Sequence, residues 1–418
     1  MYYENTNIRR IVIVGGGFGG IYTLKNLHKI FHNKNEIKVT LVNENNYFLF
    51  TPLLHEIATG NINPENAIEP IQKVLGCCID NLVVGKVLRI DNKNKKIKTT
   101  EGMLDYDYLV LAPGAETNFY DIQGAEKYSY ILKNLNDAIK IKNNFIDTLQ
   151  LASKMDASEE RRNLLRFVVV GGGPTGVEMV SEMQEFLKGT FSKYYNKELI
   201  NDVSVILVHS GEELLPQFPK SLRGRALRIL KRKGIEVRLN TKVVEVFEDG
   251  IKFVSREELK TKNVIWVAGI KPTNLIFEEE TLKDENGRIV VNKFLQTKNY
   301  SEIFAIGDVV SFYLENGEKL PALAQVAVKQ SNIVAQNIKN SISKKDLVEY
   351  KHKSPGVLVS LGKWNALGEI YRFVIEGKFA WWLWRTVYLF KLISWQKKLK
   401  VVTDWTINIF SARDISKL

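Results

Sequence analysis

Two glycine-rich turns, each standing between a β-branched run and a helical pattern, constrain most strongly what this 418-residue chain can fold into. The first turn follows the apolar run 11–14 and carries Gly15, Gly17 and Gly20. Apolar residues then recur at helical spacing as far as Phe31. Glycines at this spacing allow a tight turn and let the backbone approach a pyrophosphate at the helix N-terminus. The segment therefore predicts a strand, a dinucleotide-binding turn and a helix.

A second strand, predicted over 37–42, ends beside Asn43 and Glu44. An acidic side chain about twenty residues beyond the glycines typically binds a ribose hydroxyl of the nucleotide. Strand, turn, helix, second strand and carboxylate together favour a nucleotide site over a bare glycine turn. The ribose contact is assigned to Glu44 or to its neighbour Asn43.

The same pattern occurs again later in the chain. The run 167–170 leads into a turn with Gly171, Gly173 and Gly176, then a helical stripe, and then a predicted strand over 203–208. Two such fingerprints in the correct context are improbable by chance. The sequence therefore predicts an α/β protein with two Rossmann-like dinucleotide-binding domains.

The second copy lacks an acid at the end of its second strand, where His209 stands instead. A carboxylate there would favour NAD and repel the 2′-phosphate of NADP. The preference between NADH and NADPH is therefore left open by the sequence. A loop position without nucleotide contact is an equally good interpretation of His209.

Two further segments resemble the FAD domain of the two-dinucleotide-binding flavoprotein reductases, the glutathione-reductase-like fold. They are 108–114, which ends at Gly114, and 303–308, which ends in Gly-Asp with the carboxylate expected at a helix N-terminus. The resemblance implies FAD in the first fold, NAD(P)H in the second and contact of Asp308 with the ribityl chain. The implied domains are 1–130 and 285–345 for FAD, 131–284 for NAD(P)H, and 346–418 for a C-terminal quinone-site and membrane-anchoring region.

The cysteine count limits how electrons leave a flavin. Cys77 and Cys78 are the only cysteines and are adjacent. They cannot form a disulfide framework or a four-ligand zinc site, and a reducing compartment is expected. Disulfide and sulfide:quinone reductases need separated cysteines, so thiol chemistry is disfavoured. The five histidines show no metal-ligand spacing, and no metal is predicted.

The net charge of +12 is accompanied by a basic, aromatic segment, FAWWLWRTVYLFKLISWQKKLK, at 379–400. Apolar side chains recur on one predicted helical face, and charges interrupt the run, which favours a helix lying in the membrane interface. A buried helix or a contact between copies is the alternative. No nucleic-acid-binding module is found. The residues predicted to contact lipid are Trp381, Trp382, Trp384, Arg385, Lys391, Trp395, Lys397 and Lys398.

With these features together, the sequence resembles the type II NADH dehydrogenases, which are single-subunit, non-pumping NADH:quinone oxidoreductases. The resemblance runs nearly end to end. It is carried by both glycine turns, by 47–60, by 324–327 (Ala-Gln-Val-Ala), and by the tryptophan-rich ending through Asp404-Trp405. A quinone is also the natural lipid-soluble acceptor, because it takes up two electrons and two protons.

The resemblance implies a set of site residues. Glu178, expected in the first turn of the second helix where the dipole favours a carboxylate, is implied in proton delivery. Gln325 is implied to bind a quinone carbonyl, and Lys363 to approach the same pocket. Each has a plain alternative: a helix-start acid, an amide satisfying backbone, an exposed lysine. The implied FAD residues are Gly15, Gly17, Gly20, Asn43, Glu44, Gly114, Asp308, Ala324 and Gln325; the implied NADH residues are Gly171, Gly173, Gly176, Ala268 and Gly269.

The implied reaction has two halves. NADH transfers hydride to flavin N5, and quinone then takes two electrons, with protons supplied through Glu178 or water. Because the N-terminus shows no signal peptide, the enzyme is expected on the cytoplasmic face of the cell membrane. A homodimer is also expected. The alternatives are an NADPH-preferring or sulfide-type quinone reductase on the same scaffold, or a non-catalytic membrane-bound redox sensor.

Overall fold

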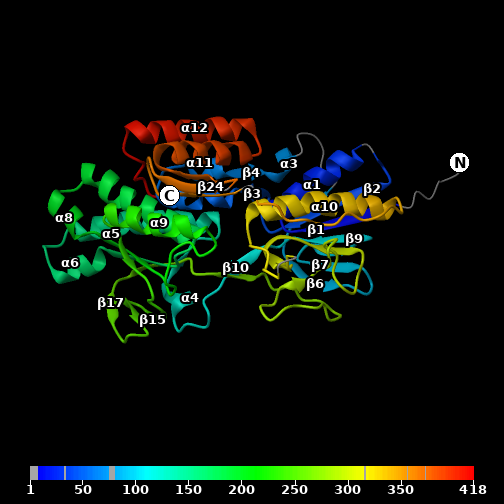
Figure 1. Cartoon of the computed structure of the whole chain (residues 1–418), viewed down its shortest axis with the longest axis horizontal. Coiled ribbons are helices and arrows are strands. Elements are labelled where there is room, and N and C mark those ends of the chain that lie inside the picture. Colours follow the sequence, from blue (N-terminus) through cyan, green and yellow to red (C-terminus); the bar gives the residue numbers. More distant parts are fainter. Residues whose placement is uncertain (1–7, 33, 75–80, 315–316, 355, 372) are drawn as a thin grey trace. The chain divides into compact units, whose positions relative to one another are not determined.

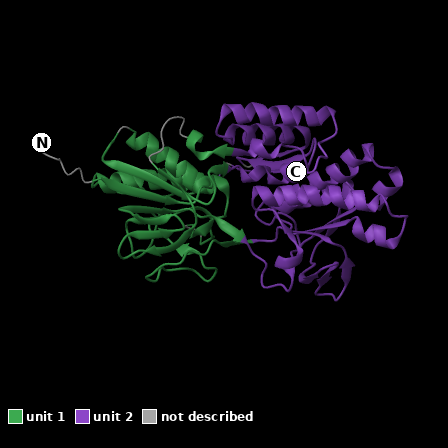
Figure 2. Ribbon diagram, turned by 180° about the vertical axis from the view of Figure 1, so that it is seen from behind, with its two compact units in different colours: residues 1–48, 69–116, 270–353 green, residues 49–68, 117–269, 354–418 purple. Residues whose placement is uncertain are grey.

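The computed structural model describes residues 8–32, 34–74, 81–314, 317–354, 356–371 and 373–418. The chain forms two compact units, each assembled from three stretches of sequence (Figures 1 and 2). Unit 1 comprises 1–48, 69–116 and 270–353, and unit 2 comprises 49–68, 117–269 and 354–418. The domain boundaries given by the sequence stay a prediction, because compactness alone does not define a domain. Cys77 and Cys78 lie outside the described residues.

Unit 1 is built on a five-stranded sheet with the order β21-β9-β1-β2-β5 and parallel pairing throughout. Its strands are β1 Arg9–Val14, β2 Ile37–Asn43, β5 Asn81–Val84, β9 Tyr108–Leu111 and β21 Ile303–Ala305. The apolar run of β1 is buried, as in parallel sheets whose two faces are both covered. Helices α1 Phe18–Phe31 and α10 Ala324–Ile342 pack against each other in this unit. The predicted strands and first helix are confirmed.

The rest of unit 1 consists of short elements. An antiparallel sheet contains β6 Val87–Asp91, β7 Lys96–Thr99 and β8 Gly102–Asp105, and a parallel pair contains β20 Ile289–Val290 and β22 Val310–Ser311. Two short helical elements are α3 Ile71–Val74 and the 3-10 turn Gly307–Val309. Four short strands lie where the chain passes from one unit to the other. They are β3 Tyr47–Leu49, β4 Ile68–Pro70, β10 Ala115–Thr117 and β19 Ile270–Pro272.

Unit 2 repeats the plan of unit 1. Its parallel sheet has the order β11-β18-β12-β13-β14. The strands are β11 Tyr130–Ile131, β12 Arg166–Val170, β13 Ser204–Val208, β14 Glu236–Arg238 and β18 Asn263–Trp266. A smaller antiparallel sheet contains β15 Val243–Phe247, β16 Gly250–Phe253 and β17 Glu258–Lys260.

Helices precede and follow the strands of this part of unit 2, and the long ones pack against the sheet. The long ones are α5 Leu135–Ala152, α7 Pro174–Gln184, which continues as a π-helix over Glu185–Thr190, and α9 Lys220–Arg232. The short ones are α2 Leu54–Ala58, α4 Ala125–Tyr128, α6 Glu159–Leu164 and α8 Lys197–Asp202, with 3-10 turns at Thr51–Leu53, Pro64–Ala67 and Phe191–Lys193. Asn134 starts α5 with a capping box formed with Asp137.

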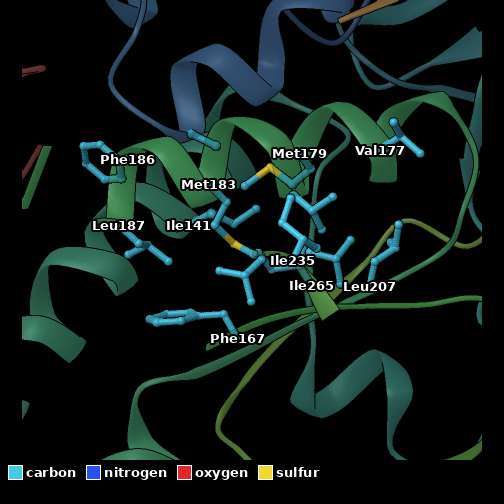
Figure 3. Packing of buried hydrophobic residues seen from close by; sticks show 14 of the residues in the cluster. Ile141, Phe167, Val177, Met179, Met183, Phe186, Leu187, Leu207, Ile235 and Ile265 are labelled. Atoms are coloured by element: carbon cyan, nitrogen blue, oxygen red, sulfur yellow. The ribbon is translucent and has the colours of Figure 1, made fainter. Parts of the chain in front are cut away.

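The main core of unit 2 lies between α7, α5 and the parallel sheet (Figure 3). Met179 and Met183 from α7 point toward Ile141 of α5 and toward the sheet residues Phe167 and Ile265. All five side chains are buried. This packing fixes the rotation of α7 about its axis, and therefore decides where its polar residues lie.

The C-terminal part of unit 2 contains an antiparallel sheet and two helices. These elements are β23 Gly356–Ser360, β24 Ala366–Ile370, β25 Phe373–Glu376, α11 Gly377–Lys391 and α12 Trp395–Phe410. The predicted continuous helix over 379–400 is therefore wrong. The chain breaks before α12, whose N-terminus is capped by the Ser394 side chain. Among the described residues, no helix is both long enough and apolar enough to cross a bilayer.

The face of α11 that the sequence assigned to lipid points into the protein. Trp381 and Trp384 are 1% and 0% exposed, and the Arg385 guanidinium lies 3.8 Å from the Trp381 ring centroid. The prediction that Trp381, Trp384 and Arg385 contact lipid is wrong, because a cation stacked on an aromatic face can be buried with it. The opposite face of the helix, which includes Trp382 and Phe390, is exposed.

Polar contacts fasten the C-terminal segments to the rest of unit 2. Arg413 is buried, and its Nη2 lies 2.6 Å from Glu182 Oε2 on α7. Asp404 on α12 accepts hydrogen bonds of 2.9 Å from the Asn63 side chain and 2.7 Å from the Asn66 side chain. The fold of unit 2 therefore depends on residues distant in sequence.

Replacing Arg413 by Met should lower the free energy of unfolding by about 3–5 kcal/mol, because it leaves the buried Glu182 without its cation. Chemical denaturation at pH 7 measures the loss. The control is Lys417→Met, which removes an ion pair with Asp147 whose side chains are 56% and 50% exposed. That control should cost less than about 1 kcal/mol. Equal losses in the two variants would contradict a buried, stabilising pair.

Candidate active site

Each parallel sheet contains a switch point, where the strand order reverses direction. In unit 1 the chain goes from β1 to β2 on one side and later returns to β9 on the other side of β1. In unit 2 it goes from β12 to β13 and later returns to β18. Ligands of such folds bind outside the carboxyl ends of the strands at this point. Both glycine turns begin there, at Gly15 and Gly171.

The two glycine turns have nearly the same geometry. A Cβ at Gly20 would lie 1.8 Å from the Gly15 oxygen, and a Cβ at Gly176 would lie 1.8 Å from the Gly171 oxygen. These close approaches exclude any side chain and bring each helix start against its turn. A Cβ at Gly17 would meet no atom within 4 Å, so this position faces open space. The glycines therefore have two roles: some permit packing and others leave room for a ligand.

The second turn differs little from the first. A Cβ at Gly173 would have only the Gln217 amide nitrogen within 4 Å, at 3.9 Å. Gly171 has a positive φ and packs against Ala268, in the segment that follows β18. Neither α1 nor α7 has a side-chain cap at its N-terminus in the described part of the chain. A helix N-terminus that follows a glycine turn is a typical binding site for an anion such as a pyrophosphate.

The residue at the end of the second strand contacts the turn in both units. Asn43 Oδ1 accepts a hydrogen bond of 2.7 Å from the Gly16 N–H, whereas Glu44 is exposed. His209 Nδ1 accepts one of 3.2 Å from the Gly172 N–H. The predicted Asn43-or-Glu44 contact thus has Asn43 directly beside the glycine turn. Burial lowers the pKa of His209, so its ring is neutral, with the hydrogen on Nε2.

The Gly-Asp segment of unit 1 lies close to the two long helices of that unit, α1 and α10. A Cβ at Gly19 would be 3.2 Å from Ile306, and a Cβ at Gly307 would be 3.5 Å from Ala327 in the first turns of α10. Asp308 occupies a single 3-10 turn and not the start of a longer helix. Ala324 and Gln325 are the first residues of α10 and are half-buried.

Sequence reasoning missed Gln330, which is fully buried on α10. Its Oε1 accepts a hydrogen bond of 2.8 Å from the Gly307 N–H, and its Nε2 has no hydrogen-bond partner among the described residues. An unpartnered buried amide beside Asp308 is consistent with a polar ligand at this turn. Its position five residues after Gln325 gave no signal, because that spacing does not return to the same helix face.

Glu178 is buried in the second turn of α7, not in the first turn as the sequence suggested. The helix dipole therefore does little for its carboxylate. Burial, chiefly, raises the pKa of Glu178 to about 8, although the Ser360 N–H donates to its Oε1 over 3.1 Å. His55 Nδ1 lies 3.9 Å from the other oxygen, Oε2. Glu178 thus holds a proton at neutral pH.

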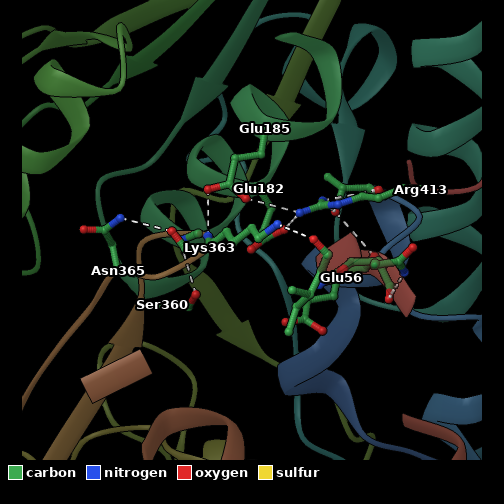
Figure 4. A network of polar contacts seen from close by, with 12 residues as sticks. Glu56, Glu182, Glu185, Ser360, Lys363, Asn365 and Arg413 are labelled. Atoms are coloured by element: carbon green, nitrogen blue, oxygen red, sulfur yellow. Dashed lines mark hydrogen bonds and ion pairs between the residues drawn. The ribbon is translucent and has the colours of Figure 1, made fainter. Parts of the chain in front are cut away.

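Lys363 lies between two parts of unit 2 (Figure 4). Its backbone N–H donates to Glu185 Oε1 over 2.7 Å, and its Nζ donates to the Ile409 carbonyl over 2.7 Å near the end of α12. This ammonium therefore stabilises a helix C-terminus. The contact of Lys363 with quinone stays a prediction.

Comparison with known proteins decides the family. The model of the pyridine nucleotide-disulphide oxidoreductase family matches residues 9–331, and that of the NDH2 C-terminal domain matches 355–414. A probable NADH dehydrogenase of Dictyostelium discoideum is 30% identical over 97% of this chain and 91% of its own length. A type II NADH:quinone oxidoreductase of Staphylococcus saprophyticus is 30% identical over 89% of this chain and 92% of its own.

The chain belongs to the type II NADH:quinone oxidoreductases. Its fold matches that of NDH2 from Plasmodium falciparum, solved in complex with NADH, with a TM-score of 0.90, 24% identity, and coverage of 98% of this chain and 100% of that one. This type II NADH:quinone oxidoreductase oxidises NADH and reduces a quinone, with FAD as its prosthetic group. An NADPH-preferring or sulfide-type quinone reductase and a non-catalytic redox sensor, the alternative functions kept open by the sequence, are not favoured.

The two glycine turns of this oxidoreductase fit FAD and NADH. In unit 1, the open position at Gly17 and the unpartnered Gln330 amide beside Asp308 suit the pyrophosphate and ribityl chain of FAD. In unit 2, the open position at Gly173 suits the pyrophosphate of NADH. Bound FAD supplies the group that accepts hydride and passes electrons onward.

Two neighbouring glycines of the NADH turn should give different defects on replacement by Ala. Gly173→Ala should raise the dissociation constant for NADH by about tenfold or more, because its Cβ enters the space left for the pyrophosphate. It should leave the melting temperature unchanged, since no atom contacts that Cβ closely. Gly176→Ala should instead lower the melting temperature. Titration calorimetry and thermal unfolding measure the two effects, and a reversed pattern would contradict the assigned roles.

Proposed function

We propose, first, that Glu178 supplies a proton during quinone reduction. We also propose that Gln325 orients the quinone. Finally, we propose that exposed aromatic residues of α11 and α12 hold the enzyme on the cytoplasmic face of the cell membrane. The observation that carries the first part is a buried carboxyl group that is protonated at neutral pH. Reduction of a quinone takes up two protons, and NADH provides only one hydride. A protonated group inside the protein meets that need.

The surroundings of Glu178 favour one position for its proton. Oε1 accepts the Ser360 N–H, so the proton is assigned to Oε2. Burial lowers the pKa of the adjacent His55 to about 4, so its ring is neutral. A charged His55 would stabilise the ionised form of Glu178, and the neutral ring does not. Burial also raises the pKa of Tyr388, and Glu178 adds to that effect. Among the neutral forms of Glu178, His55 and Tyr388, Glu178 therefore loses its proton most readily.

The membrane proposal rests on the outer faces of the two C-terminal helices. Phe379, Trp382 and Phe390 are exposed along α11, and Trp395, Leu399 and Phe410 are exposed on one side of α12. Exposed apolar residues of this size mark an interaction surface. Lys391 and Lys398 lie close to this surface, over the rings of Tyr388 and Phe390, and suit anionic lipid. Lys397, by contrast, donates to the Glu65 carbonyl over 2.6 Å.

Replacing Glu178 by Gln should slow quinone reduction by about 100-fold, because a general acid is lost. Reduction of the flavin by NADH should keep its rate. In the wild type, Glu178 loses its proton as the pH rises through about 8, so turnover should fall over that range, and this alkaline limb should vanish in the variant. Stopped-flow absorbance separates the half-reactions. An unaltered pH profile of turnover would rule out proton supply by Glu178.

Replacing Gln325 by Ala should raise the KM for quinone by about fivefold, the loss expected for one neutral hydrogen bond. Flavin reduction by NADH should again be unaffected. Gln336→Ala is the matched control, since Gln336 lies on the same helix and bonds to Asn340. The quinone role is rejected if both half-reactions slow equally.

Replacing Trp382 and Phe390 together by Ser should weaken binding to vesicles containing anionic lipid by about 100-fold, since each large apolar side chain contributes about 1.5–3 kcal/mol when buried. Both are exposed, so flavin content and stability should not change. Tyr194→Ser removes an exposed ring elsewhere in unit 2 and serves as the control. Vesicle flotation measures binding. We also propose a homodimer. If these side chains lie in the contact between two copies and not on lipid, the double variant should change the molecular size measured by gel filtration and leave vesicle binding unchanged.

A further inference from the structure

Unit 2 contains a group of four acids, of which Glu56, Glu178 and Glu182 are buried and Glu185 is half-buried. Figure 4 shows Glu56, Glu182 and Glu185. The group is larger than proton supply by Glu178 requires. Glu178, Glu182 and Glu185 lie at helical spacing along one side of α7 and its π-helical continuation. Glu56 joins them from α2 and is 1% exposed. Acids buried together cost free energy unless cations, hydrogen bonds or protons compensate them. How each acid is compensated therefore indicates its role.

Glu182 and Glu185 are compensated by cations. Arg413 Nη2 lies 2.6 Å from Glu182 Oε2 and 3.3 Å from Glu185 Oε2, and Lys233 also pairs with Glu185. Burial would raise the pKa of Glu182, but the Arg413 guanidinium, together with other nearby groups such as Lys233, lowers that pKa. Arg413 is held in turn by Thr59, whose hydroxyl accepts from Nη1 over 3.1 Å. These groups form a structural ion-pair network.

Glu56 is compensated differently. Its Oε2 accepts a hydrogen bond of 2.5 Å from the Trp405 indole N–H on α12. The nearby Arg385 guanidinium is stacked between the rings of Trp381 and Trp405, 3.8 Å and 4.8 Å from their centroids. Burial and the charge of Glu182 raise the pKa of Glu56 to about 7, while Arg385, Trp405 and Arg413 oppose that rise. Glu56 therefore loses its proton less readily than an exposed glutamate does.

Helix α2, which carries Glu56, packs against α7, which carries Glu178. His55, the residue beside Glu56 on α2, has its Nδ1 3.9 Å from Glu178 Oε2. Its Nε2 is buried and has no hydrogen-bond partner in the described residues. After burial itself, the charge on Glu56 is one of the causes that raise the pKa of Glu178. A negative charge on Glu56 makes it harder for Glu178 to ionise.

We propose that Glu56 is a positioning residue for proton supply: Trp405 and Arg385 hold its carboxyl group among the α7 acids, and its charge keeps the proton on Glu178. This inference rests on the proton role proposed above for Glu178. It makes α12 part of the reaction machinery, because the indole that fixes Glu56 belongs to that helix. A merely structural role would require only that Trp405 fill space.

Two variants test the proposal through the protonation of Glu178. Glu56→Gln keeps the shape and removes the charge, so Glu178 should lose its proton at a pH lower by roughly one unit. Trp405→Phe removes the indole donor and shrinks the ring beside Arg385. Both changes make Glu56 less charged, so the shift should have the same direction and a smaller size. Infrared spectroscopy follows the protonated carboxyl band that is missing from Glu178→Gln, and the alkaline limb of quinone-dependent turnover should move with it.

Asp404→Asn is the matched control. Asp404 adjoins Trp405 and bonds to Asn63 and Asn66, so this variant loosens the attachment of α12 without touching the buried acids. It should leave the infrared midpoint in place. The proposal is overturned if Glu56→Gln leaves the midpoint unmoved, or if Asp404→Asn moves it equally. Should Trp405→Phe fail to fold, the isosteric Glu56→Gln still decides.

The same data separate this proposal from the one on which it rests. If Glu178→Gln retains the alkaline limb of turnover, proton supply by Glu178 fails, whatever Glu56→Gln does. If Glu178→Gln removes that limb and Glu56→Gln leaves the limb and the infrared midpoint of the otherwise wild-type enzyme unchanged, only the role of Glu56 fails.

Discussion

Most of this structure depends on one kind of contact, in which two backbone segments approach so closely that no side chain fits between them. In both units the start of a helix lies against the turn before it, at Gly20 over Gly15 and at Gly176 over Gly171. This approach sets the direction of α1 and of α7. In unit 2 it also sets the position of Glu178, two residues after Gly176, so the binding turn and the proton-bearing acid share one rigid element.

Local patterns were enough to predict the two nucleotide folds. The β-branched runs, the glycines and the helical spacing are each signals carried by a few neighbouring residues, and the strands β1, β2, β12 and β13 form where those signals stand. Asn43 and His209 were also found by position, because their place at a strand end follows from the fold. The comparisons with relatives then agree with the resemblance noted from the motifs.

The C-terminal segment was predicted less well, because its aromatic pattern has two physical solutions. A stripe of tryptophans at helical spacing can face lipid or face a protein core, and sequence alone gives no partner for Arg385. The structure places Arg385 between Trp381 and Trp405, so the stripe is inside. Glu56, Glu182 and Arg413 were missed for the same reason. Each is an ordinary charged residue until the fold brings it to the others.

Unit 2 is assembled from three separate stretches of sequence, and this affects how the protein folds. Thr59 and Arg413, which are hydrogen-bonded, are 354 residues apart in the sequence. Until the last stretch arrives, Glu182 on α7 lacks the Arg413 cation, and the long loop between them must close before that contact can stabilise the fold. Unit 2 can therefore be completed only when residues from opposite ends of its sequence meet, a requirement that slows folding.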